Sequence, residues 1–376
     1  MYEAYIQKGT KRLRLGYTTG TCAAGAAKAA ALMLLTGRPV DRISILVPAG
    51  DEIPLEVEDV TMAADAVSCA VRKDGGDDPD ATDGMLIYAR VCLMPDGRDV
   101  EIDGGEGIGR VTKRGLDQAV GEAAINSVPR QMIREGVREV MALTGCTCGL
   151  SVTIYAPEGA EIARRTFNPR LGIEGGISII GTTGIVEPMS NDAILGTVKA
   201  ELSVRRAQGE RIALLTIGNY GSAYLAGHYP ALSDKAVTCS NFIGDAIDMA
   251  LGDGYEGILI LGHFGKLVKL GAGIMNTHSA FADARMDVLT TCALSAGAGL
   301  DTLRAVADAP TTDAALAVLR EAGDLDRTLQ VLTDRVDAHL RRKVREAVPI
   351  GAVLFSQAAG ITVGTDAAEA LLEALQ

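Results

Sequence analysis

Residues 181–184, Gly-Thr-Thr-Gly, form a short loop whose residue types suit the binding of an anion. Glycine lets backbone N–H groups approach a ligand closely, and the hydroxyls of Thr182 and Thr183 add hydrogen-bond donors. The loop follows the β-branched run of residues 177–180, which is typical of a short buried strand. A tight turn between two domains would have the same composition, and the loop by itself slightly favours that alternative. Anion binding gains weight because several similar loops occur along the chain.

A second threonine-rich turn, residues 15–21, leads directly into an alanine-rich segment that predicts a helix ending at Gly37. Thr18, Thr19 and Thr21 can cap this helix, whose first N–H groups would point into the turn. Simple capping and the binding of a carboxylate or phosphate fit this pattern equally well.

An acidic loop, residues 73–84, contains five aspartates. Their carboxylates could bind a hard cation, but the loop lacks the spacing and the closing glutamate of an EF-hand. A solvated hairpin explains the charges equally well, so Asp74, Asp77 and Asp78 are only candidates.

Two further motifs are weak by themselves. Gly105, Gly107 and Gly109 follow a predicted strand, as in the nucleotide-binding turn of Rossmann-like domains, but the segment after them lacks a clean apolar period. Cys146 and Cys148 suggest zinc, yet no second pair of ligands lies at finger-like spacing, so reduced structural cysteines are favoured and no metal site is predicted.

The second half of the chain repeats the order strand, glycine loop, helix. Predicted strands at residues 211–217, 236–238 and 257–261 are each followed by a loop or helix rich in small residues. This order is typical of a parallel α/β sheet, in which ligands lie at the carboxyl ends of the strands.

His263 and His278 fall in these later loops, close to Lys266 and Lys269. A single histidine is more often a hydrogen-bonded structural residue. Two of only four histidines beside two lysines favour a functional site.

The composition limits the class of protein. A chain of 376 residues with 48% hydrophobic residues suits two globular domains. The net charge of −12 argues against a nucleic-acid partner. Seven cysteines at irregular spacing without an apolar leader indicate reduced thiols in the cytoplasm. Residues 23–35 are apolar but short and interrupted by Lys28, so no membrane partner is expected.

We therefore expect an α+β domain over residues 1–192, with strands at 43–47, 53–60, 66–72 and 85–93. An α/β, Rossmann-like domain with a mostly parallel sheet would follow over residues 193–376. Its helical portion after Leu300 could pack on the sheet or on a second copy of the chain, so a homodimer stays open.

Eight segments together resemble the cobalt-precorrin-5B C1-methyltransferase family of cobalamin biosynthesis, CbiD. They are GYTTGTCAAGAAKAAA, KDGGDDPDATDG, GEGIGRVTKRGL, NPRLGIEGGISIIGTTGIVEPMS, GNYG, CSNFIGDAID, GHFGKLVKLGAGIMNTHS and ADARMDVL, between about residues 16 and 289. The chain departs from the family pattern where Asp83 stands in place of an expected histidine, and where Arg114 and Ser127 stand in place of prolines. The first departure removes a proton carrier from the acidic loop.

The resemblance implies transfer of a methyl group from S-adenosylmethionine to C1 of cobalt-precorrin-5B, giving cobalt-precorrin-6A in the oxygen-independent route to cobalamin. Cobalt would arrive only as part of the tetrapyrrole substrate. Methyl transfer is a displacement that needs positioning and exclusion of water rather than a nucleophile motif. The many carboxylates of the substrate would need concentrated N–H, lysine and arginine donors on this acidic protein.

We assign residues to this chemistry as a hypothesis. Cofactor binding is assigned to six residues of the α/β half: Gly218, Asn219, Gly221, Asn241, Gly262 and Gly265. Residues 105–109 are the rival location. Substrate binding in a cleft between the domains is assigned to Thr18, Thr19, Thr21, Arg110, Lys113, Thr182, Thr183, Lys266 and Lys269. Three residues are candidates for accepting the released proton: Glu187, His263 and His278.

Two alternatives remain. An NAD(P)-dependent oxidoreductase would share the α/β half, but the segment GNYG matches G-x-G-x-x-G poorly. A non-catalytic tetrapyrrole carrier would need one set of glycine loops, whereas this chain has two.

Overall fold

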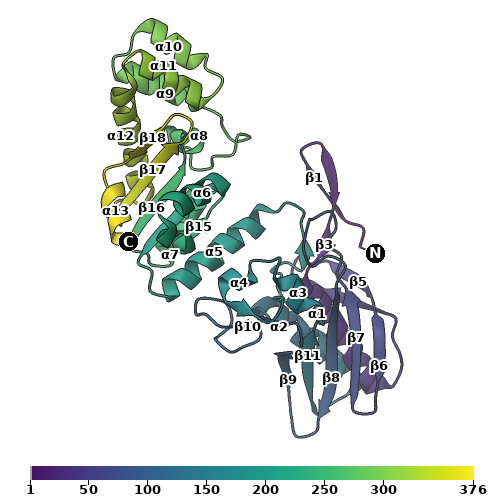
Figure 1. Cartoon of the computed structure of the whole chain (residues 1–376). Helices are drawn as coiled ribbons and strands as arrows, with labels where there is room; N and C mark the ends of the chain where they lie inside the picture. Colours follow the sequence, from purple (N-terminus) through teal and green to yellow (C-terminus); the bar gives the residue numbers. More distant parts are fainter. Residues whose placement is uncertain (1) are drawn as a thin grey trace. The chain divides into compact units, whose positions relative to one another are not determined.

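The computed structural model describes residues 2–376 and divides the chain into two compact units, with the boundary between Ser190 and Asn191. Each unit has its own central sheet and its own hydrophobic core (Figure 1). The chain is thus a mixed α/β protein with two sheet-containing regions.

The first unit is built on a five-stranded sheet of order β6-β7-β8-β11-β9. Neighbouring strands are antiparallel except for β11 and β9, which are parallel. The strands are β6 (Glu58–Met62), β7 (Ala66–Arg72), β8 (Leu86–Met94), β9 (Val100–Gly104) and β11 (Gly149–Tyr155). Alternate residues of β7, β8 and β11 enter the core, so the sheet has one face that packs on the core.

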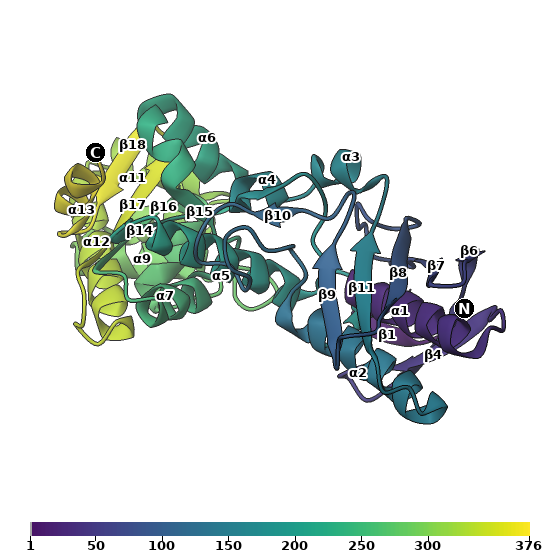
Figure 2. The ribbon, with the colours of Figure 1, turned by 90° about the horizontal axis from the view of Figure 1, so that it is seen from below.

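Helices α1 (Thr19–Thr36) and α2 (Ser127–Thr144) cover the buried face and pack against each other (Figure 2). The alanines of α1 let it approach its neighbours closely, and at Gly25 a Cβ atom would lie 2.3 Å from the side chain of Leu55. Within residues 2–376, α1 is the one helix with the length and apolar composition to cross a bilayer, and 72% of it is buried in the unit. It is the core helix of this unit.

Short elements complete the first unit. Four pairs of strands are antiparallel: β1 (Tyr5–Lys8) with β2 (Lys11–Arg14), β3 (Gly16–Tyr17) with β13 (Ile185–Val186), β4 (Arg42–Leu46) with β5 (Glu52–Glu56), and β10 (Arg110–Val111) with β12 (Ile173–Glu174). The short helices are α3 (Gly159–Ala163) and α4 (Asn168–Leu171).

Two strand predictions in this unit need correction. Residues 177–180 form no continuous strand, because Ile177 pairs with Ile108 and Ile179 pairs with Ile125, each as an isolated bridge. Residues 53–60 form two strands, β5 and β6, because the chain changes partner near Val57 and pairs first with β4 and then with β7.

The second unit has a five-stranded sheet of order β15-β14-β16-β17-β18. Strands β14 (Ile212–Thr216), β15 (Ala236–Thr238), β16 (Gly257–His263) and β17 (Ile350–Ser356) pair in parallel, and β18 (Ile361–Gly364) is antiparallel at one edge. The central strands β16 and β17 are buried almost throughout, as expected when helices cover both faces.

The two faces of this sheet belong to different core clusters. Helices α6 (Gly218–His228) and α13 (Ala368–Leu375) pack on one face, with Leu214, Leu259 and Leu261 of the strands. Helices α5 (Asn191–Ala207) and α7 (Ile243–Gly252) pack on the other, with Leu215 and Ile260.

The helical tail packs on its own unit. Helices α9 (Arg285–Ser295), α10 (Leu300–Ala307), α11 (Thr312–Glu321) and α12 (Leu325–Lys343) add buried residues to the same cluster as α5 and α7. Helix α8 (Phe264–Leu267) and the 3₁₀ helices η1 (Pro230–Lys235) and η2 (Val268–Ala272) fill the connections.

Candidate ligand site at the carboxyl edge of the second sheet

The strand order of the second sheet reverses direction beside β14. From β14 the chain moves to β15 on one side and later returns to β16 on the other side. In sheets of this kind the crevice at such a reversal, at the carboxyl ends of the strands, is where ligands bind. The loops that follow β14, β15 and β16 therefore define the candidate site.

Gly218 leaves β14 with a left-handed backbone, at a φ of 62°. A Cβ atom at this position would meet nothing within 4 Å, so the glycine is required by the turn and faces open space. Asn219 and Tyr220 follow it in the first turn of α6, and the Tyr220 side chain is 69% exposed. This loop presents both open backbone and an accessible aromatic ring.

His263, the last residue of β16, has a fixed ring. Its Nδ1 atom accepts a hydrogen bond from the Gly265 N–H at 3.1 Å, and its ring centroid lies 5.5 Å from that of Tyr220. Because a backbone N–H can only donate, the neutral imidazole carries its proton on Nε2. His263 is therefore arranged to donate a hydrogen bond rather than to accept a proton.

Lys266 and Lys269 are held by neutral oxygens. The Lys266 Nζ donates to Asn241 Oδ1 at 2.6 Å, and the buried Lys269 Nζ donates to the carbonyls of Thr277 and Ala282 at 3.1 and 2.7 Å. Within residues 2–376 neither ammonium makes an ion pair with a carboxylate. Burial lowers the pKa of both lysines, because it disfavours the charged form. Two cations without ion-pair partners favour the arrival of an anion.

His278 lies exposed on the loop after η2. Its Nδ1 atom accepts a hydrogen bond from the Ala280 N–H at 3.1 Å, and the backbone N–H of His278 donates to Asn276 Oδ1. The same argument as for His263 makes its neutral imidazole a donor at Nε2.

The six predicted cofactor residues lie in the first turn of α6, in the segment before α7, at the end of β16 and in α8, and three of the glycines have close neighbours. At Gly221 a Cβ atom would lie 3.2 Å from the Leu261 carbonyl, and at Gly262 it would lie 3.2 Å from Ile217 and Leu267. At Gly265 a Cβ atom would lie 3.2 Å from Thr312, and the Gly265 N–H donates to His263 Nδ1. Gly218, Asn219 and Asn241 stay candidates for contact with a ligand.

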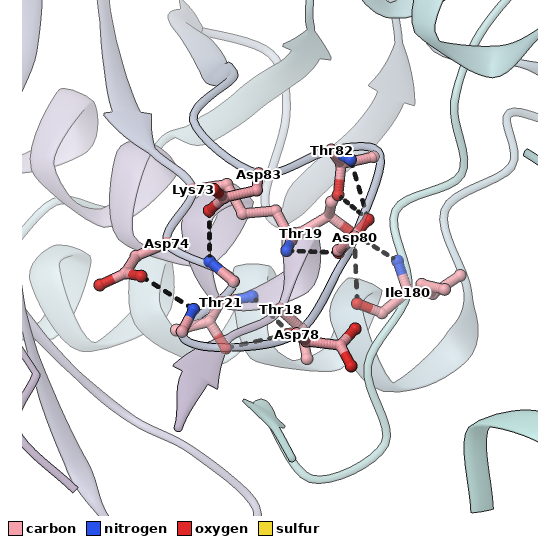
Figure 3. A network of polar contacts seen from close by, with 12 residues as sticks. Thr18, Thr19, Thr21, Lys73, Asp74, Asp78, Asp80, Thr82, Asp83 and Ile180 are labelled. Carbon is pink, nitrogen blue, oxygen red and sulfur yellow. Dashed lines mark hydrogen bonds and ion pairs between the residues drawn. The ribbon is translucent and has the colours of Figure 1, made fainter. Parts of the chain in front are cut away.

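The threonines that begin α1 are used within the first unit, which argues against their assignment to the substrate. The Thr18 Oγ1 accepts from the Thr21 N–H, and the Thr21 Oγ1 donates to the Gly184 carbonyl at 2.7 Å. The Thr19 Oγ1 accepts from the Ile180 N–H at 2.9 Å (Figure 3). The three side chains are at most 8% exposed. Their role in this structure is to cap α1 and to hold residues 180–184.

The other predicted residues of the first unit are more open. Thr182 and Thr183 are exposed, and Lys113 is half-buried with its Nζ 3.4 Å from the Arg170 carbonyl. Arg110 makes a two-point ion pair with Asp103.

Glu187 is an exposed carboxylate. It forms a 2.8 Å ion pair with the Lys8 Nζ, and 44% of its side-chain surface is accessible. Unlike the two histidines, it has free lone pairs that can take a proton.

The glycine turn at residues 105–109 is closed by its own neighbours. Gly105 donates to the Ile154 carbonyl and Gly109 to the Ile177 carbonyl, so these N–H groups have partners. At Gly107 a Cβ atom would lie 1.7 Å from the Ala156 carbonyl. These glycines serve close packing, which argues against the rival cofactor location.

The acidic loop is a structural hairpin. Asp74 makes a two-point ion pair with Arg14, at 2.5 and 2.7 Å, and Asp78 accepts from the Met189 N–H. Asp80 pairs at 2.6 Å with the buried Lys73 (Figure 3).

The pKa values of Asp74 and Asp80 lie below the usual range. The main cause for Asp74 is the hydrogen bond from Arg14. For Asp80, burial by itself would raise the pKa. The charge of Lys73 and the hydrogen bonds from Lys73 and Thr82 outweigh burial and lower the pKa. Asp77 accepts from the Arg14 N–H, so the three candidates for a cation are occupied by internal donors. Residues 2–376 contain no group of three or more His, Cys, Asp or Glu side chains that could hold a metal ion.

Comparisons with known proteins match nearly the whole chain. The family model described as CbiD matches residues 6–188, and the model described as CbiD, C-terminal domain, matches residues 276–366. The cobalt-precorrin-5B C(1)-methyltransferase of Ruminiclostridium cellulolyticum is 45% identical over 94% of this chain and 92% of its own length. The protein of the same name from Alkaliphilus metalliredigens is 41% identical over 100% of this chain and 98% of its own.

One solved structure is also similar. The crystal structure of the cobalamin biosynthesis protein (cbiD) from Archaeoglobus fulgidus is 29% identical, covers 75% of this chain and 86% of its own, and has a TM-score of 0.40.

Proposed function

The chain belongs to the CbiD family, so its activity is that of a cobalt-precorrin-5B C(1)-methyltransferase of cobalamin biosynthesis, and we propose that S-adenosylmethionine is its methyl donor. The observation that carries this conclusion is identity of more than 40% with relatives of that name over almost the full length of both chains. A cytoplasmic location is part of the proposal, because seven free cysteines suit a reducing compartment.

We place the donor at the carboxyl edge of the second sheet, in a unit of Rossmann-like, doubly wound type. The parallel pairing of four strands and the reversal beside β14 support this position. Gly218 offers open space next to its backbone, as a ligand that approaches the main chain requires. S-adenosylmethionine, when bound, supplies an activated methyl group for a displacement reaction, and the chain has to orient it and exclude water.

Lys266 is the residue we assign to a carboxylate at this edge, either that of the donor or one of the tetrapyrrole. Its ammonium is held by Asn241 and lacks an ion-pair partner within the described chain, so a carboxylate would be its first counter-charge. The Nε2 atoms of His263 and His278 can donate to further carboxylates. Lys269 raises the positive charge nearby without being exposed itself.

The tetrapyrrole has further candidate partners in the first unit, namely Arg110, Lys113, Thr182 and Thr183. Among the three residues considered for accepting the released proton, Glu187 is favoured, because both histidines use Nδ1 to accept a backbone N–H.

The first experiment is a calorimetric titration of the protein with S-adenosylhomocysteine, the stable demethylated product. Lys266→Met should weaken binding roughly tenfold if the lysine meets the carboxylate of the donor, since a charge-assisted hydrogen bond is lost. Lys343→Met is the matched control, because Lys343 lies in the same unit but pairs with Asp248 on its surface.

The titration of Lys266→Met tests where the donor binds, and the titration of the wild type tests whether S-adenosylmethionine is the donor. Tight binding to the wild type that Lys266→Met leaves unchanged would assign Lys266 to the substrate or to no ligand, while the proposed donor would stand. Absence of binding to the wild type, also with the precorrin present, would contradict the use of S-adenosylmethionine.

A further inference from the structure

Cys146 and Cys148 lie close together in the exposed turn between α2 and β11. Their sulfur atoms are 3.1 Å apart. Both ends of the turn are anchored. Helix α2 ends with Gly145 in a left-handed conformation and the Cys146 N–H bound to the Met141 carbonyl, and β11 begins with the Gly149 N–H bound to the Gly97 carbonyl. The fold therefore holds the two thiols against each other.

The other five cysteines have different surroundings. Cys22, Cys69, Cys239 and Cys292 are buried, and burial raises the pKa of Cys22, Cys69 and Cys239 to about 12. Such thiols stay protonated and are inert at neutral pH. Cys92 is half-buried, as Cys146 and Cys148 are, but within the described residues its sulfur contacts no second cysteine.

A metal does not explain the pair. A closed zinc site needs four ligands, and in the part of the chain that the structure describes no third His, Cys, Asp or Glu side chain joins the two sulfurs. The chemistry open to two adjacent thiols without further ligands is their joint oxidation.

We propose that Cys146 and Cys148 form a reversible dithiol–disulfide site that exchanges with low-molecular-weight disulfides. The thiolate of one cysteine attacks the external disulfide, which gives a mixed disulfide and releases one small thiolate. The sulfur of the other cysteine, as its thiolate, then attacks the protein sulfur of that mixed disulfide and releases the second small thiolate. The two protein thiols lose two electrons and two protons, and the external disulfide becomes two thiols.

The site should be easy to reduce again. The ring that such a disulfide closes contains only one residue between the two cysteines, and a short, partly exposed ring stores strain that favours reduction. The hydrogen bond with Cys146 raises the pKa of the Cys148 thiol, so exchange should accelerate as the pH rises and more thiolate forms.

Oxidised glutathione is the probe for the test. The folded full chain is exposed to it, quenched with acid, alkylated under denaturing conditions and digested with trypsin. Cleavage after Arg138 and Arg164 gives a peptide that contains Cys146 and Cys148 and no other cysteine. We expect this peptide to lose both alkylation sites and two hydrogen atoms of mass, and dithiothreitol to restore the doubly alkylated form.

Two variants make the result specific. Cys148→Ser should trap glutathione on Cys146, because the second sulfur that releases it is missing. Cys92→Ser should oxidise like the wild type, since it leaves the pair intact. A wild-type peptide that stays doubly alkylated, or one that carries glutathione on both sulfurs, would overturn the proposal.

Discussion

At the scale of single residues, the same side-chain type has opposite roles in this protein, depending on its neighbours. Thr21 is fully buried and donates to the Gly184 carbonyl. Thr182, two residues before Gly184 in the sequence, is exposed and makes no hydrogen bond within the described chain. His263 and His278 likewise act as hydrogen-bond donors because a backbone N–H occupies Nδ1 in each.

Thr21→Val tests the hydrogen bond by which Thr21 holds Gly184, and leaves the Thr18 cap of α1 in place. Valine keeps the shape of threonine and removes the hydroxyl, and the Gly184 carbonyl keeps its hydrogen bond from the Thr18 N–H. We expect a loss of about 1 kcal/mol in the free energy of unfolding, the usual net value of a buried hydrogen bond. Urea unfolding measures it. Thr182→Val is the matched control and should change stability by less than about 0.5 kcal/mol; equal effects of the two variants would refute a stabilising contact between Thr21 and Gly184.

At the scale of elements, glycine loops divide into those that pack and those that stay open. The turn at residues 105–109 and the segment around Gly176 approach each other so closely that a Cβ atom at Gly176 would lie 2.1 Å from the Gly107 carbonyl. The loop between β14 and α6 has the opposite character, because Gly218 faces open space. The first arrangement joins elements of one unit, and the second leaves room for a ligand.

Gly176→Ala should destabilise the first unit by about 1–3 kcal/mol, because backbone atoms have to move to admit the methyl group. Thermal or urea unfolding of the full chain measures the loss. Gly196→Ala in α5 is the control, since nothing lies within 4 Å of its Cβ position, and it should stabilise the helix by about 0.5–1 kcal/mol. A neutral Gly176→Ala variant would show that the turn is looser than described.

At the scale of the whole molecule, two units with separate cores make up the chain. The first unit ends at Ser190, and each unit has its own sheet. The first owes part of its order to carboxylates that hold the acidic hairpin, whereas the second has mostly apolar central strands.

Residues 1–190 and 191–376, produced separately, should each unfold cooperatively in urea, because each has its own buried cluster. Circular dichroism and fluorescence of the two fragments check this. A fragment without a cooperative transition would mean that its core needs the rest of the chain.

The first unit should lose stability in acid. The pKa values of Asp74 and Asp80 lie below the ordinary value of 3.8, so their contribution is fully present above that pH and is lost as the pH falls through the lowered values. Urea midpoints measured from about pH 6 down to about pH 2 should therefore fall below about pH 4. Asp74→Asn should flatten the decline. A midpoint that stays constant over this range would contradict the ion pairs of the hairpin.

The sequence by itself determined the family, a mixed α/β protein, and the order of strands and glycine loops in the second half. These properties depend on local periodicity and on motifs that can be read without knowing contacts. The predicted boundary after residue 192 lies beside the boundary at Ser190, and the loops with Gly218 and Gly265 fall at one sheet edge because parallel strands end on the same side.

Only the tertiary structure decided which small-residue loops are open. Residues 18–21, 105–109 and 218–221 are each rich in glycine or threonine, and these residues serve close packing and ligand contact equally well. The atoms that occupy each Cβ position come from segments far away in the sequence, such as Ala156 beside Gly107 and Thr18 beside Gly181. The same reason explains why the open backbone at Gly218 could not be told from the closed turn at Gly107 before the fold was known.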